Sequence, residues 1–436
     1  MDTKFWDRPE VNLSRKKAYL YAAVWIASGL VGIIAVLYAR FISHLQFHYF
    51  GTFNDHPYLV SLLGPFLFLM ATAVVKKLAP DAKGSGIPQV LAAIDLAKHQ
   101  KEPDGAWGSS LVSLKTSVVK VISSAIGILG GASIGREGPT VQLAATGFAW
   151  VGKKVRSVAP EIDFQSFLIA GAAAGVSAAF NTPIAGIAFA LEEIADGIFG
   201  PFRQLIMLAV ILAGITSQGF SGNYLYFGQP VIIKSSFSLL IPEALILGVI
   251  GGLLGGLLAR FLAYPQMSRL PGHWALRAFV CGALCSVIGY LTHGATAGSG
   301  YEAAKAVLES DNMNSAYYAF PLLKFATTIL SYLSGMAGGI FSPCLSIGAG
   351  LGVTLAKLAH FANFKSCALI GMVAFFSGAV RAPLTGVIIV MEMTDEHTLV
   401  LPFMIAAFIA FSLGKRVMPT PLYHFLAQRF LDREQL

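Results

Sequence analysis

The sequence predicts an all-α polytopic membrane protein made of two repeats of broken, tilted helices. Of its 436 residues, 55% are hydrophobic and 12% are charged, whereas soluble domains carry charge on about 25% of their residues. The mean hydropathy of +0.67 and the 45 glycines are typical of membrane-spanning helices, in which Gly is more frequent than in soluble ones. This composition excludes a cytosolic enzyme, a disordered chain and a nucleic-acid-binding module.

Apolar segments follow one another along the chain with few polar interruptions. A helix that crosses a bilayer needs about 20 residues, so several of these segments are too short to cross, and Gly and Pro interrupt others. Discontinuous helices of this kind occur at membrane depth only where irregular backbone lines a cavity within the protein. The segments lie at about residues 18–44, 58–79, 108–130, 140–152, 165–180, 183–195, 203–219, 238–262, 274–292, 318–336, 344–360, 367–380, 383–393 and 398–414.

Basic residues near both ends of the chain predict its orientation, because positive charge beside spanning helices marks the cytoplasmic side. Residues 1–17 are expected to form a cytoplasmic segment, residues 18–430 a single transmembrane transport domain, and residues 431–436 a short cytoplasmic tail. Both termini are then cytoplasmic, and basic loops account for the net charge of +8. The charges concerned are Arg15, Lys16, Lys17, Lys415, Arg416, Arg429 and Arg433.

Two halves of the chain, at about residues 58–219 and 274–430, share an ordered pattern of residues. A two-fold repeat of broken helices predicts a transporter-like fold with its site at the repeat interface. An odd number of crossings in each half would make the two repeats inverted. The first-half residues Gly171, Ala174, Pro183, Gly186 and Glu192 recur as Gly371, Ala374, Pro383, Gly386 and Glu392. Two glycine motifs recur as well, Gly84-Ser85-Gly86 as Gly298-Ser299-Gly300 and Gly130-Gly131 as Gly338-Gly339.

Three segments rich in glycine and proline carry the chemistry. In each of them glycines permit a tight bend and the following proline is suited to open a helix. A helix N-terminus has free N–H groups and a partial positive charge, so it binds anions without a full cation. Three such ends that converge predict a weakly holding anion site, as transport requires, although any one alone is explained by close helix packing. The segments are Gly84-Ser85-Gly86-Ile87-Pro88, Gly135-Arg136-Glu137-Gly138-Pro139 and Gly338-Gly339-Ile340-Phe341-Ser342-Pro343.

In this order, and with Tyr423 late in the chain, these motifs resemble those of the CLC family of chloride channels and proton-coupled chloride antiporters. The resemblance covers nearly the whole chain. It implies a homodimer with one pore per subunit, and in each subunit two inverted halves with about 18 helical segments. It further implies chloride and protons as substrates, and a multi-pass protein surrounded by lipid in a bacterial inner membrane. Neither a cofactor nor a metal is expected, nor enzymatic activity or regulatory CBS domains.

The resemblance also implies the residues of a central anion site. Ser85 and Tyr423 would donate side-chain hydroxyl groups to the anion, and Ile340 and Phe341 would donate backbone N–H groups. Hydroxyls and amides supply hydrogen-bond donors without a fixed charge, so chloride would be held and could still leave.

The external end of the site is assigned to Arg136, Glu137 and Gly138, whose backbone N–H groups would bind the anion. A carboxylate among apolar residues is unfavourable by about 2.5–3.5 kcal/mol at mid-depth of a bilayer, and an ion pair with Arg136 is one explanation for its presence. The other explanation is a gate. The ionised carboxylate of Glu137 would occupy the anion site, and the protonated form would leave it, so that one residue gates chloride and carries a proton.

Two adjacent acids follow the apolar run from Ile184 to Leu191. Glu192 and Glu193 point about 100° apart on a helix, so one can face the interior and the other the edge. The resemblance implies that Glu193 is the internal proton-transfer residue of an antiporter, because family channels usually carry an apolar residue there. Glu192, like its repeat mate Glu392, is interpreted as structural. Without the resemblance, the residues themselves leave an alternative open, in which Glu192 and Glu193 are both carboxylates at the membrane edge.

Other functions remain as alternatives. A passive chloride channel of the same family is the main one, and a fluoride exporter fits the motifs less well. Gln89 and Leu91 stand where many relatives carry acids, which leaves the inner proton route open. Gly131-Ala132-Ser133-Ile134-Gly135 matches the G-x-S-x-G pattern of serine hydrolases, but that pattern requires a strand before the turn. The remote alternative is therefore an intramembrane hydrolase with Ser133 as its nucleophile.

Overall fold

The computed structural model describes residues 9–99, 109–156, 164–194, 203–222, 225–228, 230, 237–264, 273–309, 318–361 and 363–434. Within these ranges the chain forms 17 α-helices and no β-strand, so the predicted all-α class is confirmed. Residues 1–8 of the expected N-terminal segment and residues 435–436 of the expected tail lie outside the described residues.

Most helices begin and end close to the predicted apolar segments. Seven of them are long and apolar enough to cross a membrane, namely α1, α2, α9, α10, α12, α15 and α18. In chain order the helices are α1 (Pro9–Asp55), α2 (Pro57–Leu78), α3 (Ile87–His99), α5 (Leu114–Leu129), α6 (Glu137–Val155), α7 (Phe164–Phe180), α8 (Pro183–Phe189), α9 (Arg203–Ser221), α10 (Phe237–Ala263), α12 (Trp274–Leu291), α13 (Tyr301–Glu309), α14 (Phe320–Ser334), α15 (Phe341–Leu358), α16 (Phe364–Val380), α17 (Pro383–Thr394), α18 (Val400–Val417) and α19 (Leu422–Glu434).

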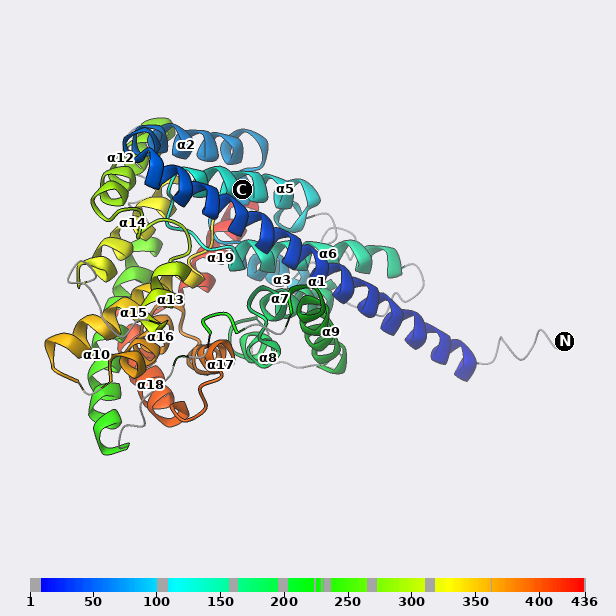
Figure 1. Ribbon diagram of the computed structural model, residues 1–436. Helices are drawn as coiled ribbons and strands as arrows, with labels where there is room; N and C mark the ends of the chain where they lie inside the picture. The colour runs from blue at the N-terminus through cyan, green and yellow to red at the C-terminus, as the bar shows by residue number, and fades with distance from the viewer. Residues whose placement is uncertain are drawn as a thin grey trace.

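The repeat predicted from the sequence is present and inverted. Helices α2, α3 and α5 to α9 correspond in order to α12 to α18, and the mates α8 and α17 lie side by side (Figure 1). The carboxylate of Glu192, just after α8, accepts hydrogen bonds from the N–H groups of Leu384 and Thr385 in the first turn of α17. Glu392, near the end of α17, accepts from Ile184 and Ala185 in the first turn of α8. The C-terminal end of each helix thus contacts the first turn of the other, so α8 and α17 run antiparallel.

The two-fold axis passes close to Gly135 and Gly339. These glycines exchange two backbone hydrogen bonds, of 2.7 Å from Gly135 N to Gly339 O and of 2.8 Å in the other direction, as antiparallel mates on an axis do. In this register Gly131 corresponds to Gly335, and both adopt positive φ, 77° and 92°, at the ends of α5 and α14. The predicted match of Gly130-Gly131 with Gly338-Gly339 was therefore wrong, since adjacent glycines recur by chance in a glycine-rich chain.

The structure differs from the expected segments at four helices, α1, α8, α13 and α19. Helix α1 begins at Pro9 rather than near residue 18, and the apolar segments did not include α13 or α19. Both of these helices carry several charged residues, which conceals them in a search for apolar runs. The expected segment 183–195 is an α-helix only to Phe189 and continues as a π-helical turn, Ala190–Ile194. Such turns are frequent at functional sites, and this one contains both acids.

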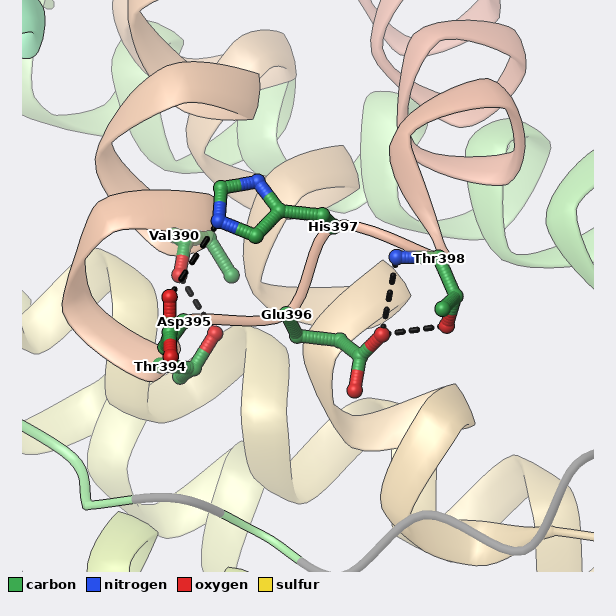
Figure 2. A network of polar contacts seen from close by, with 6 residues as sticks. All are labelled: Val390, Thr394, Asp395, Glu396, His397 and Thr398. Carbon is green, nitrogen blue, oxygen red and sulfur yellow. Dashed lines mark hydrogen bonds and ion pairs between the residues drawn. The ribbon is translucent and has the colours of Figure 1, made fainter.

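The turn after α17 is held by its own side chains, as Figure 2 shows. Thr394 Oγ1 donates to Val390 O (2.7 Å), Asp395 adopts a left-handed conformation, and His397 contacts the Asp395 carboxylate at 3.2 Å. At the end of α17, Met393 O accepts a hydrogen bond of 3.1 Å from Phe227 N. This contact fixes the short segment that precedes α10 and carries Tyr226.

Candidate functional site

The three glycine bends meet in one place. Gly84 N donates to Met336 O (2.9 Å) and Gly338 N donates to Gly84 O (3.0 Å), next to the pair formed by Gly135 and Gly339. Helices α3, α6 and α15 each begin two or three residues after these bends. Gly138 packs so closely on Ser85 that a Cβ atom there would overlap the serine hydroxyl. Three helix N-termini thus face one buried region.

Ser85 and Tyr423 supply two hydroxyl groups to this region. Their exposed fractions are 1% and 0%, and Ser85 is a close polar neighbour of the Tyr423 hydroxyl. Among the described residues neither Ser85 Oγ nor Tyr423 Oη has a hydrogen-bond partner. A buried polar group left unsatisfied is unfavourable by about 1–3 kcal/mol, so both hydroxyls are available to a bound group.

The start of α15 adds backbone donors. Ile340 and Phe341 open this helix, and the first N–H groups of a helix have no acceptor within it. The Phe341 ring is held by Phe180 and Phe376, with centroids at 4.8 and 4.4 Å, which keeps the backbone in place. Ser342, which was not predicted, also has a buried hydroxyl without a partner in the part of the chain that is described.

Glu137 is the first residue of α6 and is 1% exposed. Its Oε1 accepts a hydrogen bond of 3.2 Å from the Tyr226 hydroxyl, whereas its buried Oε2 has no partner among the described side chains. Tyr226 is 3% exposed and packs against Phe180 and Tyr301, with centroids at 5.9 and 4.9 Å. The carboxylate therefore sits at a helix N-terminus, where an anion would be stabilised.

Arg136 turns away from its neighbour Glu137. Its Nη1 donates to Ala39 O (2.9 Å) and to Ser43 Oγ (2.8 Å), both on α1. Its guanidinium lies 5.6 Å from the centroid of the Tyr226 ring. Arg136 and Tyr226 line a cavity of about 680 Å³ beside Glu137.

The two acids of the π-helical turn have different surroundings. Glu193 is 3% exposed, and its Oε1 lies 4.0 Å from His424 Nε2. Glu192 is half-buried and accepts bonds of 2.8 Å from Leu384 N and 2.7 Å from Thr385 N. The extra residue in a π turn rotates the chain, so Glu193 faces the interior while Glu192 caps a helix.

Two buried lysines were missed in the sequence. Lys120 and Lys324 are repeat mates, and each is fully buried. Lys120 Nζ donates to Gly84 O (2.9 Å), and Lys324 Nζ donates to Gly298 O and Thr296 O (both 2.8 Å). Each lysine thus holds the bend before α3 or α13. A charged residue inside an apolar segment is by default a candidate functional residue, so the sequence did contain the signal that could have identified both lysines.

Ser133 is not arranged as a nucleophile. Its hydroxyl shares a hydrogen bond of 2.8 Å with Thr328 Oγ1, which is not a general base, and the residue is fully buried. The side chain of Gln89 donates to Asp81 O (2.8 Å) and Lys83 O (2.6 Å). It therefore stabilises the loop before α3.

Fold and site together define a membrane protein with inverted repeats around a buried region where three helix N-termini meet. A family model described as voltage gated chloride channel matches residues 67–415. The chain belongs to this family, the CLC family. It is 30% identical to the H(+)/Cl(-) exchange transporter ClcA of Salmonella paratyphi A, over 95% of this chain and 89% of that protein.

Solved structures of the same architecture are also similar. The crystal structure of a slow cyanobacterial Cl⁻/H⁺ antiporter has a TM-score of 0.82 at 22% identity, over 96% of this chain and 99% of that chain. A CLC-type fluoride/proton antiporter has a TM-score of 0.75 at 25% identity, over 93% of this chain and 97% of that chain. These likenesses agree with the fold described above.

Proposed function

We propose that the protein is an electrogenic proton-coupled chloride antiporter. The observation that carries this proposal is the buried Glu137 carboxylate at the N-terminus of α6, beside hydroxyl donors that have no hydrogen-bond partner within the described ranges. An ionised carboxylate there substitutes for a bound anion. Protonation removes its charge, and chloride can then take its place. The relation of the chain to ClcA supports the same exchange.

Chloride is assigned to the region between Ser85, Tyr423 and the start of α15. Hydroxyl and amide donors bind it without a permanent countercharge, so it can be released to either side. The proton is assigned to Glu137 on one side and to Glu193 on the other. The second candidate function is a passive chloride channel, which requires no internal acid. The burial of Glu193 beside a titratable side chain favours the antiporter.

Purified protein in liposomes tests the proposal when chloride and pH are recorded together. A chloride gradient should drive protons uphill, whereas a channel would move chloride alone. Fluoride is included as a second anion because one similar structure is a fluoride/proton antiporter. Chloride preference would support the assignment, and transport of fluoride in place of chloride would overturn it.

The assembly is proposed to be a homodimer with two independent pores in a bacterial inner membrane, with both termini cytoplasmic. One described subunit contains every group of the site, which supports independent pores. Tandem-linked subunits with one disabled pore should retain about half the flux. Complete loss of flux would contradict independence.

Tyr423→Phe should weaken chloride binding without unfolding the protein. The ring remains in its buried site, and only the hydroxyl donor is lost. A hydrogen bond to a charged group contributes about 1.5–3 kcal/mol, so the affinity should fall about tenfold or more and coupling should loosen. Tyr423→Ala should do the same with an added loss of packing. If calorimetric chloride binding and coupling are both unchanged in Tyr423→Phe, Tyr423 is only a packing residue.

Tyr226→Phe should loosen the gate. The phenol hydrogen bond of 3.2 Å stabilises the ionised carboxylate of Glu137 in its buried position, so its loss should favour release. Chloride flux at alkaline pH should rise, measured as anion efflux from liposomes over a pH series. Tyr301→Phe is the matched control, because Tyr301 packs on the same ring and its hydroxyl interacts with Lys305. Equal pH profiles in the wild type and Tyr226→Phe would contradict the role.

A further inference from the structure

Glu193 needs a path to water if it transfers protons, and its own exposure does not provide one. Its side chain is 2% exposed, whereas that of the neighbouring His424 is 36% exposed. His424 is titratable, lies at ion-pair distance from Glu193 and is the more exposed of the two side chains. This inference rests on the proposed function, in which Glu193 is the internal proton acceptor.

His424 lines a cavity of about 230 Å³ between α3 and α19. Leu91, Asp95 and Lys98 of α3 form one wall, and Gln428 of α19 extends the wall that contains His424. His424 directly follows Tyr423, and adjacent residues of a helix point about 100° apart. One turn of α19 therefore places a hydroxyl in the anion region and an imidazole between the cavity and Glu193.

The charged groups around this imidazole come from several elements. Asp95 and Lys98 lie on α3, in the wall of the cavity, and Glu193 lies on the π-helical turn. Arg381, at the end of α16, interacts electrostatically with Glu193, and its Nη2 donates to Met418 O and Pro419 O. An imidazole has two ring nitrogens, so it can take up a proton at one and release a proton from the other, which none of the other charged groups named here can do.

We propose that His424 relays protons between the cavity and Glu193. At 4.0 Å the two atoms are too far apart for direct transfer, so the proton passes through one bridging water. The imidazolium Nε2–H bond breaks as the water takes this proton, the water releases another proton that forms an O–H bond with Glu193 Oε1, and a neutral ring remains. The ring then turns toward the cavity and takes a proton from hydronium or a buffer acid there. His424 is partly exposed, and rotamer changes of exposed side chains take picoseconds to nanoseconds, so rotation of the ring is fast. The reverse sequence releases protons from Glu193.

The test measures proton and chloride flux in liposomes that contain His424→Asn or His424→Ala. Removal of a proton-transfer group slows the step it serves by about 100-fold or more, so coupled proton flux near neutral pH should fall at least about tenfold. Millimolar imidazole should restore proton flux in His424→Ala, because the cavity is large enough to admit it. Gln428→Ala is the matched control, since it alters the same cavity without removing a titratable group.

A second experiment, in the Glu137→Gln variant, distinguishes a proton-relay role of His424 from a purely structural one. In Glu137→Gln, which should pass chloride without protons, adding His424→Asn should leave the chloride flux within about twofold. A parallel fall of chloride flux in this background would show that His424 serves the anion region instead, and would overturn the relay. Failure of imidazole to restore proton flux in His424→Ala would also overturn it.

The relay and the proposed function fail in different ways. If Glu193→Gln abolishes coupling while His424→Asn keeps the wild-type proton flux and pH profile, the relay alone is wrong. If Glu193→Gln retains full coupling, Glu193 is not the internal acceptor and the relay is wrong with it. Absence of proton flux in the wild type would overturn the antiporter itself.

Discussion

Glu137→Gln should pass chloride but carry no protons. The amide has the shape of the protonated carboxyl group and stays neutral, so it cannot hold the anion region as an ionised carboxylate does. The buried position of Glu137 at the N-terminus of α6 makes this the largest expected change. In liposomes, proton flux driven by a chloride gradient should fall to the leak of protein-free vesicles. The chloride flux should also lose its pH dependence.

The amide can still accept a hydrogen bond from Tyr226, so the local packing should persist. Thermal unfolding of Glu137→Gln in detergent serves as the control and should match that of the wild type. Uphill proton transport by a folded Glu137→Gln variant would refute the gate assignment.

Glu193→Gln should abolish uphill proton transport and leave chloride permeation intact. Glu193 is buried beside His424, and a neutral amide at this place cannot accept the proton. Its removal should not open or block the anion region, because the proton route need not follow the anion path. The measurement is the proton flux under a chloride gradient, with chloride flux recorded in the same vesicles.

Glu192→Gln is the matched control, because it changes the adjacent acid in the same way. Glu192 holds the first turn of α17 through Leu384 and Thr385. An amide loses the charge and one of these bonds, so stability should fall by about 1–2 kcal/mol while coupling changes less. If Glu192→Gln uncouples as strongly as Glu193→Gln, the assignment between the two acids is wrong.

Most of the fold could be predicted from the sequence because a bilayer imposes a simple rule. Backbone groups must be satisfied within helices, so apolar runs mark them well. Helices α13 and α19 were missed because they are not apolar. The register of the repeat could not be read from adjacent glycines. It became clear only from the hydrogen bonds between Gly135 and Gly339.

The site was predictable where a motif joined residues near in sequence, as at Glu137. The other residues of the site are far apart in the sequence and come together only in the folded protein. Tyr226 reaches Glu137 from a short segment before α10, and His424 reaches Glu193 from the start of α19. No pattern in the sequence predicts either contact. The burial of Lys120 and Lys324, by contrast, could have been inferred from their apolar surroundings.

The central claim is that chloride and proton movements are coupled, and one measurement tests it most directly. Chloride that leaves a vesicle and a proton that enters move charge in the same direction, so coupled exchange is voltage-sensitive. Wild-type protein in liposomes with an outward chloride gradient should drive protons inward against their own gradient, with a fixed ratio of the two fluxes. Chloride flux that reverses at the equilibrium potential of chloride, with no proton flux at any pH, would contradict the antiporter and establish a channel.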